Sequence, residues 1–371
     1  MTKRFFKITL AVFAGSFFGL NAQSITTALP FLEVAADARA AGLGDQGVAT
    51  APDAFSQQWN SSKYAFAENE MAVALNVTPY LSKLVSDIVL GNLVGYKRLS
   101  DGRSAVAASF RYFSLGEVEF RETQDSEVFT EKPVEFTFDV SYALKLSDNF
   151  SMSVAGRYLR SDLRFQSLEN TDAEAGNGFG VDITGFYQSR DVNLGNMDGR
   201  WRAGFAITNI GPKMKYTEGE ENFIPTNLRF GGGLDFDIDA FNKIRTSLEF
   251  SKLLVPSPQN DGSEQDQSSI GSIFTSFTDA EGGLKEEAKE VTASLGVEYV
   301  YDDVFALRAG YFHEHEDKGA RKFVSLGAGF KYTSIGIDMS YLFSTSDVAS
   351  PLDGTLRFGL TFAFGDEMRD F

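Results

Sequence analysis

Hydrophobic and polar residues alternate strictly along residues 133–160, and the same pattern recurs through most of the chain. Large apolar side chains occupy every second position from Val134 to Leu144, and mostly polar residues lie between them. After the short turn at 147–149, the alternation resumes from Phe150. Because successive side chains of a strand point to opposite faces, this stretch predicts an antiparallel hairpin with one apolar and one polar face.

About fourteen segments of this kind follow residue 69. Most have roughly ten residues, the length that a tilted strand needs to cross a bilayer, whereas strands of soluble sheets are commonly five or six residues long. The expected spans are 70–80, 87–99, 103–114, 133–146, 149–161, 178–188, 200–210, 226–236, 243–252, 290–300, 304–313, 321–332, 335–344 and 354–364.

The connections between these segments alternate between short and long. The short ones include 100–102, 147–149, 302–303 and 333–334, and the long ones are 115–132, 162–177, 211–225 and 253–289. Outer-membrane barrels have short periplasmic turns and long outer loops, and only the 189–199 connection departs from this pattern. The sequence therefore predicts an all-β fold, a transmembrane antiparallel β-barrel of about 14 strands.

Charged residues recur on the polar faces of the expected strands. An Arg or Lys that faces hydrocarbon at the bilayer midplane costs about 2–4 kcal/mol, so these charges are expected to point into the lumen. They could line a solute path, but we expect them to pair with one another and with a plug. The residues are Asp139, Arg157, Asp182, Arg202, Arg229, Asp235, Arg245, Glu298, Arg308 and Arg357.

The N-terminal part of the chain lacks the strand pattern. Lys3, Arg4 and Lys7 precede an apolar stretch too short to span a bilayer, which is typical of a signal peptide cleaved after Ala22. Residues 23–69 are rich in Gly, Ala and Asp, and we expect them to form a hatch or plug in the lumen. The predicted organisation is residues 1–22 as signal peptide, 23–69 as hatch, 70–364 as barrel and 365–371 as a periplasmic tail.

Three glycines of the hatch match a dinucleotide-binding pattern. Gly42, Gly44 and Gly47 are spaced as G-x-G-x-x-G. That fingerprint requires a buried strand before it and a crossover helix after it, and neither is indicated here. We expect these glycines instead to let the backbone pack closely inside a crowded lumen.

Composition narrows the possible functions. Asp and Glu number 51 against 34 Lys and Arg, which disfavours nucleic acid as a partner. The chain has no Cys, so disulfides, thiol catalysis and cysteine metal sites are excluded. Phe and Gly number 35 each, which suits packed sheets with aromatic belts at membrane interfaces. No cofactor is indicated.

Few residues offer catalytic or metal chemistry. His313 and His315 are the only histidines, and two ligands leave a zinc site incomplete, so we expect a solvated acidic loop there. Residues 260–266 resemble a calcium loop without its full ligand spacing, and we interpret them as a loop tip. No nucleophile motif is present, and we expect no enzyme activity and no metal site.

The longest connection, 253–289, contains the best candidate for a partner-binding surface. Leu284, Lys285, Glu286 and Glu287 belong to a short helical pattern in which opposite charges are close. Long loops on rigid scaffolds often carry binding function. We therefore expect these four residues to contact a protein partner.

The hatch contains an ordered string of short motifs. They are Leu29-Pro30-Phe31-Leu32, Asp37-Ala38-Arg39-Ala40-Ala41-Gly42, Gly47-Val48-Ala49-Thr50, Pro52-Asp53-Ala54, Trp59-Asn60 and Lys63-Tyr64-Ala65-Phe66. This string resembles the N-terminal segment of the PorV family, outer-membrane proteins of the type IX secretion system in Bacteroidetes. A departure from the family pattern is Ser61-Ser62, where Pro-Ala is expected. The resemblance implies a fourteen-stranded barrel like that of FadL, with Asp37, Arg39, Asp53, Trp59 and Asn60 packing the hatch into the lumen.

The resemblance also implies a function at the cell outer membrane. PorV-like proteins associate with the SprA-type translocon barrel, receive cargo proteins by their C-terminal signal domains, and deliver them to the PorU-type attachment complex. The alternative is a FadL-like transporter of hydrophobic small molecules, which would need an apolar pocket between hatch and wall. The same fold serves both functions.

Overall fold

The computed structural model describes residues 27–81, 87–120, 128–163, 175–193, 198–217, 220–258, 266–346 and 352–365. The predicted signal peptide, nearly all of the predicted tail and most of the loop tip 260–266 lie outside these residues.

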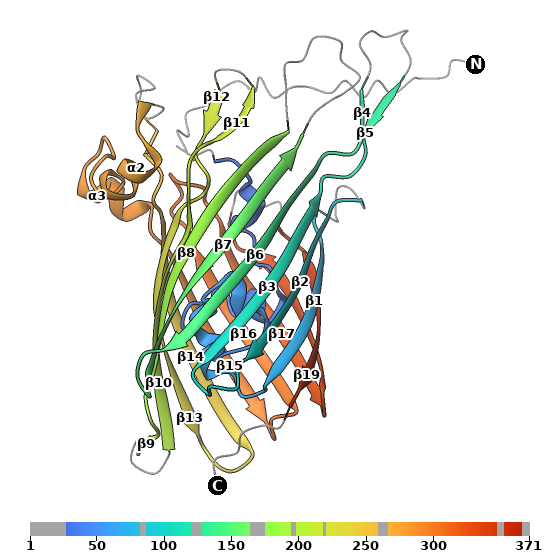
Figure 1. Cartoon of the computed structure of the whole chain (residues 1–371), viewed down its shortest axis with the longest axis vertical. Coiled ribbons are helices and arrows are strands. Elements are labelled where there is room, and N and C mark those ends of the chain that lie inside the picture. Colours follow the sequence, from blue (N-terminus) through green and yellow to red (C-terminus); the bar gives the residue numbers. More distant parts are fainter. Residues whose placement is uncertain are drawn as a thin grey trace.

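Fourteen long strands of the described chain form a closed antiparallel barrel (Figure 1). Each strand pairs with its neighbours in sequence, and β1 pairs with β19, with Met71 opposite Phe364, to close the ring. The strands are β1 (Met71–Pro79), β2 (Val89–Arg98), β3 (Ser104–Ser114), β6 (Val134–Lys145), β7 (Phe150–Asp162), β8 (Gly176–Gln188), β10 (Asp198–Ile210), β13 (Asn227–Asp237), β14 (Asn242–Leu253), β15 (Thr292–Tyr301), β16 (Phe305–His313), β17 (Lys322–Tyr332), β18 (Ile335–Ser344) and β19 (Leu356–Phe364).

The predicted fold is confirmed. All fourteen expected segments are strands, and their ends agree with the prediction to within two residues, as where the expected 178–188 is Gly176–Gln188. The long connections carry the added elements at one end of the barrel: β4 (Val118–Phe120), β5 (Phe129–Glu131), β11 (Met214–Thr217), β12 (Glu220–Asn222), α2 (Ser269–Thr275) and α3 (Leu284–Lys289) (Figure 1). We call this end the outer rim. The short turns and β9 (Val192–Asn193) lie at the opposite end.

The wall is apolar outside because alternate residues of each strand point outward. On β1, for example, Val73, Leu75 and Val77 are exposed while Ala72 and Ala74 are buried. Aromatic rings form a continuous outward row across four strands, from Phe110 through Phe136 and Tyr158 to Phe179, with ring centroids 5.4–6.2 Å apart. Such aromatic girdles mark the bilayer interfaces of membrane barrels. No helix in the described part of the chain is long and apolar enough to cross a membrane.

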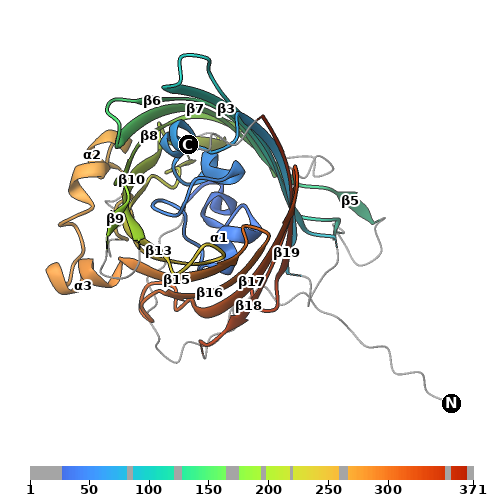
Figure 2. The ribbon, with the colours of Figure 1, turned by 90° about the horizontal axis from the view of Figure 1, so that it is seen from below.

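The N-terminal segment lies inside the ring of strands (Figure 2). Its helical turns are η1 (Pro30–Glu33), α1 (Ala38–Gly42), η2 (Ala54–Gln58) and η3 (Ser61–Phe66). Asp37 caps α1 by accepting a hydrogen bond from the Ala40 amide at 2.7 Å, and Asn60 accepts one from the Ser62 amide at the start of η3. The short polar caps and small residues allow these turns to fit a narrow lumen. We call residues 27–69 the hatch.

Candidate functional site

Arg39 joins the hatch to the barrel wall. It extends from α1, and its Nε and Nη2 atoms donate to the two carboxylate oxygens of Glu298 on β15 at 3.0 and 2.9 Å. Its Nη1 atom donates to Asp53 of the hatch at 2.6 Å. Glu298 also pairs with Arg308 at 2.8 Å and with Arg245 at 3.3 Å. Such bidentate, charge-assisted bonds fix both distance and orientation, so this cluster fastens α1 to three adjacent strands.

A second group of contacts holds the hatch to itself and to the opposite wall. The Trp59 indole donates to Asp37 at 2.9 Å, on the carboxylate oxygen not used by the helix cap. The Asn60 amide donates to the carbonyl of Val48 at 2.9 Å and to that of Gly185 on β8 at 3.0 Å. The structure thus pairs Arg39 with Asp53 and Trp59 with Asp37, while Asn60 joins the hatch to β8 separately.

Burial sets the ionisation of the hatch. Burial, with the negative charge of Asp53, raises the pKa of Asp37 to about 6, against the hydrogen bonds from Ala40 and Trp59. Lys63 is fully buried and donates to the Gly47 carbonyl and the Thr50 hydroxyl. Burial lowers the pKa of Lys63 to about 8, although Asp53 favours its charge. The hatch therefore holds groups that titrate near neutral pH.

The wall charges predicted to face the lumen do so, and most of them pair closely, whereas the buried Arg357 lies 3.9 Å from Asp45 of the hatch. Arg157 on β7 bonds to Asp139 and Asp182 of the neighbouring strands and to Asn209. Arg202 donates to the Ala49 carbonyl of the hatch at 2.9 Å and pairs with Asp235. Some of the wall charges therefore pair with one another and others hold the hatch, as expected from their position on the polar strand faces.

Several contacts were not singled out by the sequence pattern. The carboxylate of Glu249 on β14 accepts from the amides of Gly47 and Val48, each at 2.8 Å. Arg111 on β3 donates to carbonyls of Phe31 and Val34. The sequence shows only that both side chains lie on the polar face of a predicted strand. It does not indicate their partners, because the backbone groups of an irregular segment leave no sequence pattern.

The glycines of the hatch pack against the wall. Gly44 has φ +84°, and a Cβ there would lie 2.9 Å from the carbonyl oxygen of Tyr311 on β16. A Cβ on Gly42 would lie 3.1 Å from the Cα of Gly327 on β17. The absence of a Cβ allows these two glycines to approach the wall closely. A Cβ on the third glycine of the pattern, Gly47, would instead lie 2.2 Å from the Trp59 ring inside the hatch.

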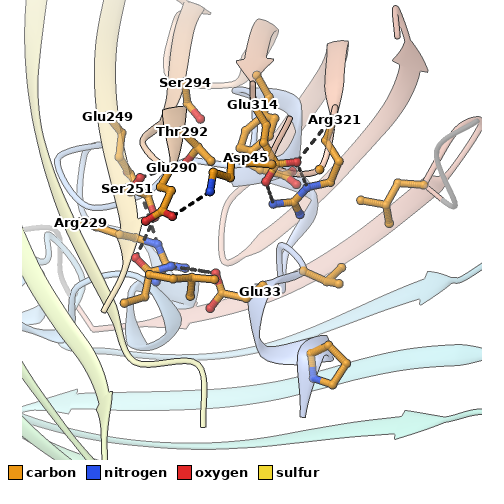
Figure 3. Close-up of a pocket in the computed structure, with 18 of the residues that line it drawn as sticks. Glu33, Asp45, Arg229, Glu249, Ser251, Glu290, Thr292, Ser294, Glu314 and Arg321 are labelled. Carbon is orange, nitrogen blue, oxygen red and sulfur yellow. Dashed lines mark hydrogen bonds and ion pairs between the residues drawn. The ribbon is translucent and has the colours of Figure 1, made fainter. Parts of the chain in front are cut away.

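A cavity of about 350 Å³ lies at the outer rim, between the start of the hatch and the upper ends of the wall strands (Figure 3). Its charged lining residues are Glu33, Asp45, Arg229, Glu249, Glu290, Glu314, Lys318 and Arg321. Arg229 lies 3.5 Å from Glu33 and 3.8 Å from Glu249, and Arg321 pairs with Glu314 at 2.8 Å. With Trp59, Tyr80 and Phe312 as its aromatic lining, the cavity is amphipathic and strongly charged.

The long connection between β14 and β15 is fastened to the outer rim by ion pairs. Lys252, at the end of β14, pairs with Glu287 at 2.9 Å and with Glu290 at 2.5 Å, all three buried. Lys318 pairs with Glu286 at 2.8 Å. Of the four residues expected to contact a partner, Leu284 is 81% exposed and Lys285 is also exposed. The carboxylate of Glu287 is buried against Lys252, and contact of these four residues with a partner stays a prediction.

The histidines lie beside this loop. His313 ends β16, and His315 accepts a hydrogen bond from the Asp317 amide at 3.2 Å. Within the described ranges no group of three or more His, Asp or Glu side chains is arranged to hold a metal ion.

The family model for the type IX secretion system protein PorV matches residues 19–260. The chain belongs to the PorV family. Among solved structures, the P. putida toluene transporter TodX is 12% identical with a TM-score of 0.51, over 90% of this chain and 99% of that chain. The deltaS2 mutant of the TodX monoaromatic hydrocarbon channel has a TM-score of 0.52 at 11% identity, over 89% and 97% of the chains. These likenesses show a shared fold.

No curated protein sequence matches the chain. Family and fold together place this member of the PorV family in the outer membrane as a β-barrel of the type IX secretion system. The outer rim, with its long loops, is then the end that faces the cell exterior.

Proposed function

We propose that this PorV protein binds secreted cargo through the C-terminal signal domains of the cargo. In this proposal it receives cargo at an SprA-type translocon barrel and passes it to a PorU-type attachment complex. Cargo binds at the outer rim, including Leu284 and Lys285 of α3. No cargo or solute passes through the lumen.

The filled lumen is the observation that carries this proposal. Arg39, Asn60 and Lys63 of the hatch are all buried, and they are bonded to β15, to β8 and to the hatch itself. Opening a path would uncouple several buried ion pairs, and breaking one such pair costs about 3–5 kcal/mol. A protein that works at its outer surface has no need to open that path.

The second candidate is transport of hydrophobic small molecules. It is favoured by the structural likeness to proteins described as toluene and monoaromatic hydrocarbon channels. An apolar solute in the cavity would displace water from charged groups of its lining, among them Arg229, Glu249 and Arg321, and would offer them no hydrogen bonds in return. The charged lining therefore favours the secretion function.

Deletion of the gene distinguishes the two. The secretion function predicts that proteins with type IX signal domains disappear from the cell surface and the medium, and that hydrocarbon uptake is unchanged. Normal secretion with impaired uptake of hydrophobic solutes would overturn the proposal in favour of transport.

Crosslinking locates the working surface. The chain has no Cys, so Lys285→Cys carries a single photoactivatable crosslinker at the outer rim, and Asp148→Cys, at a short turn of the opposite end, is the matched control. We expect cargo or translocon adducts from position 285 and none from 148. Equal yields from both positions, or none from 285, would show that α3 does not take part.

A further inference from the structure

One face of α2 is apolar and has no partner within the described chain. Ile270 is 70% exposed, Phe274 is 75% exposed, and Phe277, just beyond the helix, is 44% exposed. Their spacing of four and then three residues places them on one side of a helical turn. Apolar residues scattered singly on a surface are ordinary, whereas three together on one face indicate a binding surface.

The opposite face of α2 is fixed to the barrel. Ser272 and Ser276 are buried, and Ser272 lies against the Leu254 carbonyl just after β14. Residues four apart share one face of a helix, and that face lies opposite the one formed by Ile270 and Phe274. The apolar side chains are therefore held pointing away from the barrel and cannot fold back onto it.

The α2–α3 segment lies outside the ring of strands. Both views show it beside the outer surface of the wall near the rim, next to β8, β10 and β13, rather than over the lumen (Figures 1 and 2). The adjacent wall is lipid-facing and ends in stacked aromatic rings, Phe230 on β13 and Phe250 on β14, 5.4 Å apart. The apolar face of α2 thus continues the apolar surface that the wall presents to the bilayer.

We propose that α2 lies in the interface of the outer leaflet, with Ile270, Phe274 and Phe277 inserted among the lipids next to the wall. The helix Ser269–Thr275 contains no charged residue, so insertion desolvates no charge. Moving each of these exposed apolar side chains from water into the lipid is favourable. The contact tethers the long loop to the membrane plane, and it does not depend on the proposed secretion function.

The purified full-length chain in phosphatidylcholine vesicles tests this directly. Phe274→Cys, labelled with an environment-sensitive fluorophore, reports the surroundings of α2. Leu295→Cys, on the lipid-facing wall and 52% exposed in the protein alone, is the lipid control, and Lys285→Cys on α3 is the water control. Ile270→Cys provides a second probe of α2 should the first variant not fold.

We expect the label at 274 to be quenched by lipids with a nitroxide near the headgroup, and its quenching by aqueous iodide to be severalfold weaker than at 285. A label at 274 that iodide quenches as strongly as at 285 overturns the proposal. Shielding from iodide without nitroxide quenching also overturns it, because a second copy of the chain then covers the face. No cargo or translocon is present, so failure here leaves the secretion function untouched.

Discussion

The indole of Trp59, an intrinsic fluorophore, donates a hydrogen bond to Asp37, which is a titratable group inside the barrel. The pKa of Asp37 is raised to about 6 by burial, from an ordinary value of 3.8. Because the folded state therefore holds this proton more tightly than the unfolded chain, the ionised carboxylate costs stability above about pH 6. That cost is relieved as the pH falls from 6 towards 4.

A fluorescence titration checks this. The chain has two Trp, so Trp201→Phe leaves Trp59 as the only indole. We expect its emission to change with a midpoint near pH 6, as protonation of Asp37 weakens the acceptor. Asp37→Asn in the same background removes the transition; a transition that persists in that variant would assign it to another group.

Gly44 tests the close packing of the hatch. Gly44→Ala introduces a Cβ 2.9 Å from the Tyr311 carbonyl at φ +84°. Gly102→Ala is the matched control, because its φ of +68° is similarly unfavourable but a Cβ there meets open space. We expect Gly102→Ala to lower the free energy of unfolding by about 1 kcal/mol and Gly44→Ala to lower it distinctly more. Denaturant unfolding in detergent measures both. Equal losses would mean that the hatch does not press against β16.

At the scale of elements, the strands could be predicted because one face of each contacts lipid and the other the lumen. That difference produces a two-residue period in the sequence. On β1, for example, the lipid-facing Val73 and Leu75 alternate with the lumen-facing Ala72 and Ala74. The hatch has no such period, since its short turns are buried on all sides. Its contacts, such as Glu249 with the amides of Gly47 and Val48, depend on backbone groups that the sequence does not mark.

The outer loop was predicted only in part, for a related reason. The charge pattern around α3 predicts a short helix that contacts a protein partner. In the structure Glu287 faces Lys252 across 35 positions of sequence, a pairing that needs the barrel to bring β14 and α3 together. Leu284 and Lys285, which make no such pair in the described chain, remain exposed.

The Lys252 contacts predict how firmly this loop is held. Lys252→Met leaves the buried carboxylates of Glu287 and Glu290 without their shared cation, a loss of about 3–5 kcal/mol for a fully broken pair, reduced here because Lys318 still pairs with Glu290. We expect limited proteolysis between β14 and β15 to become much faster. Lys285→Met, at an exposed position, should leave the rate unchanged. Unchanged cleavage in both would show that the ion pairs do not hold the loop.

At the scale of the whole molecule, the hatch blocks the lumen of the barrel. Its ion pairs and hydrogen bonds reach strands on several sides of the ring, including β8, β14 and β15. We expect the full-length chain in planar bilayers to show no steady conductance. A chain without residues 27–66 should insert, checked by heat-modifiable migration, and conduct ions. An intact chain that conducts as well as the truncated one would rule out a plug.

In the proposed function the hatch stays in place while cargo binds at the outer rim. Ser61 of η3 and Ser153 of β7 have their hydroxyl oxygens 2.6 Å apart, close enough for a cysteine pair to form a disulfide, about 2.05 Å between sulfurs. The chain has no other Cys, so Ser61→Cys with Ser153→Cys links hatch to wall uniquely.

Secretion of type IX cargo by cells that carry only this double variant is the most direct test. If the hatch stays in place, the amount of cargo secreted is the same with the disulfide formed as after its reduction. It is also the same as in cells that carry either single variant. Secretion that stops when the disulfide forms and returns on reduction would contradict it, because the hatch would then have to move for cargo to pass.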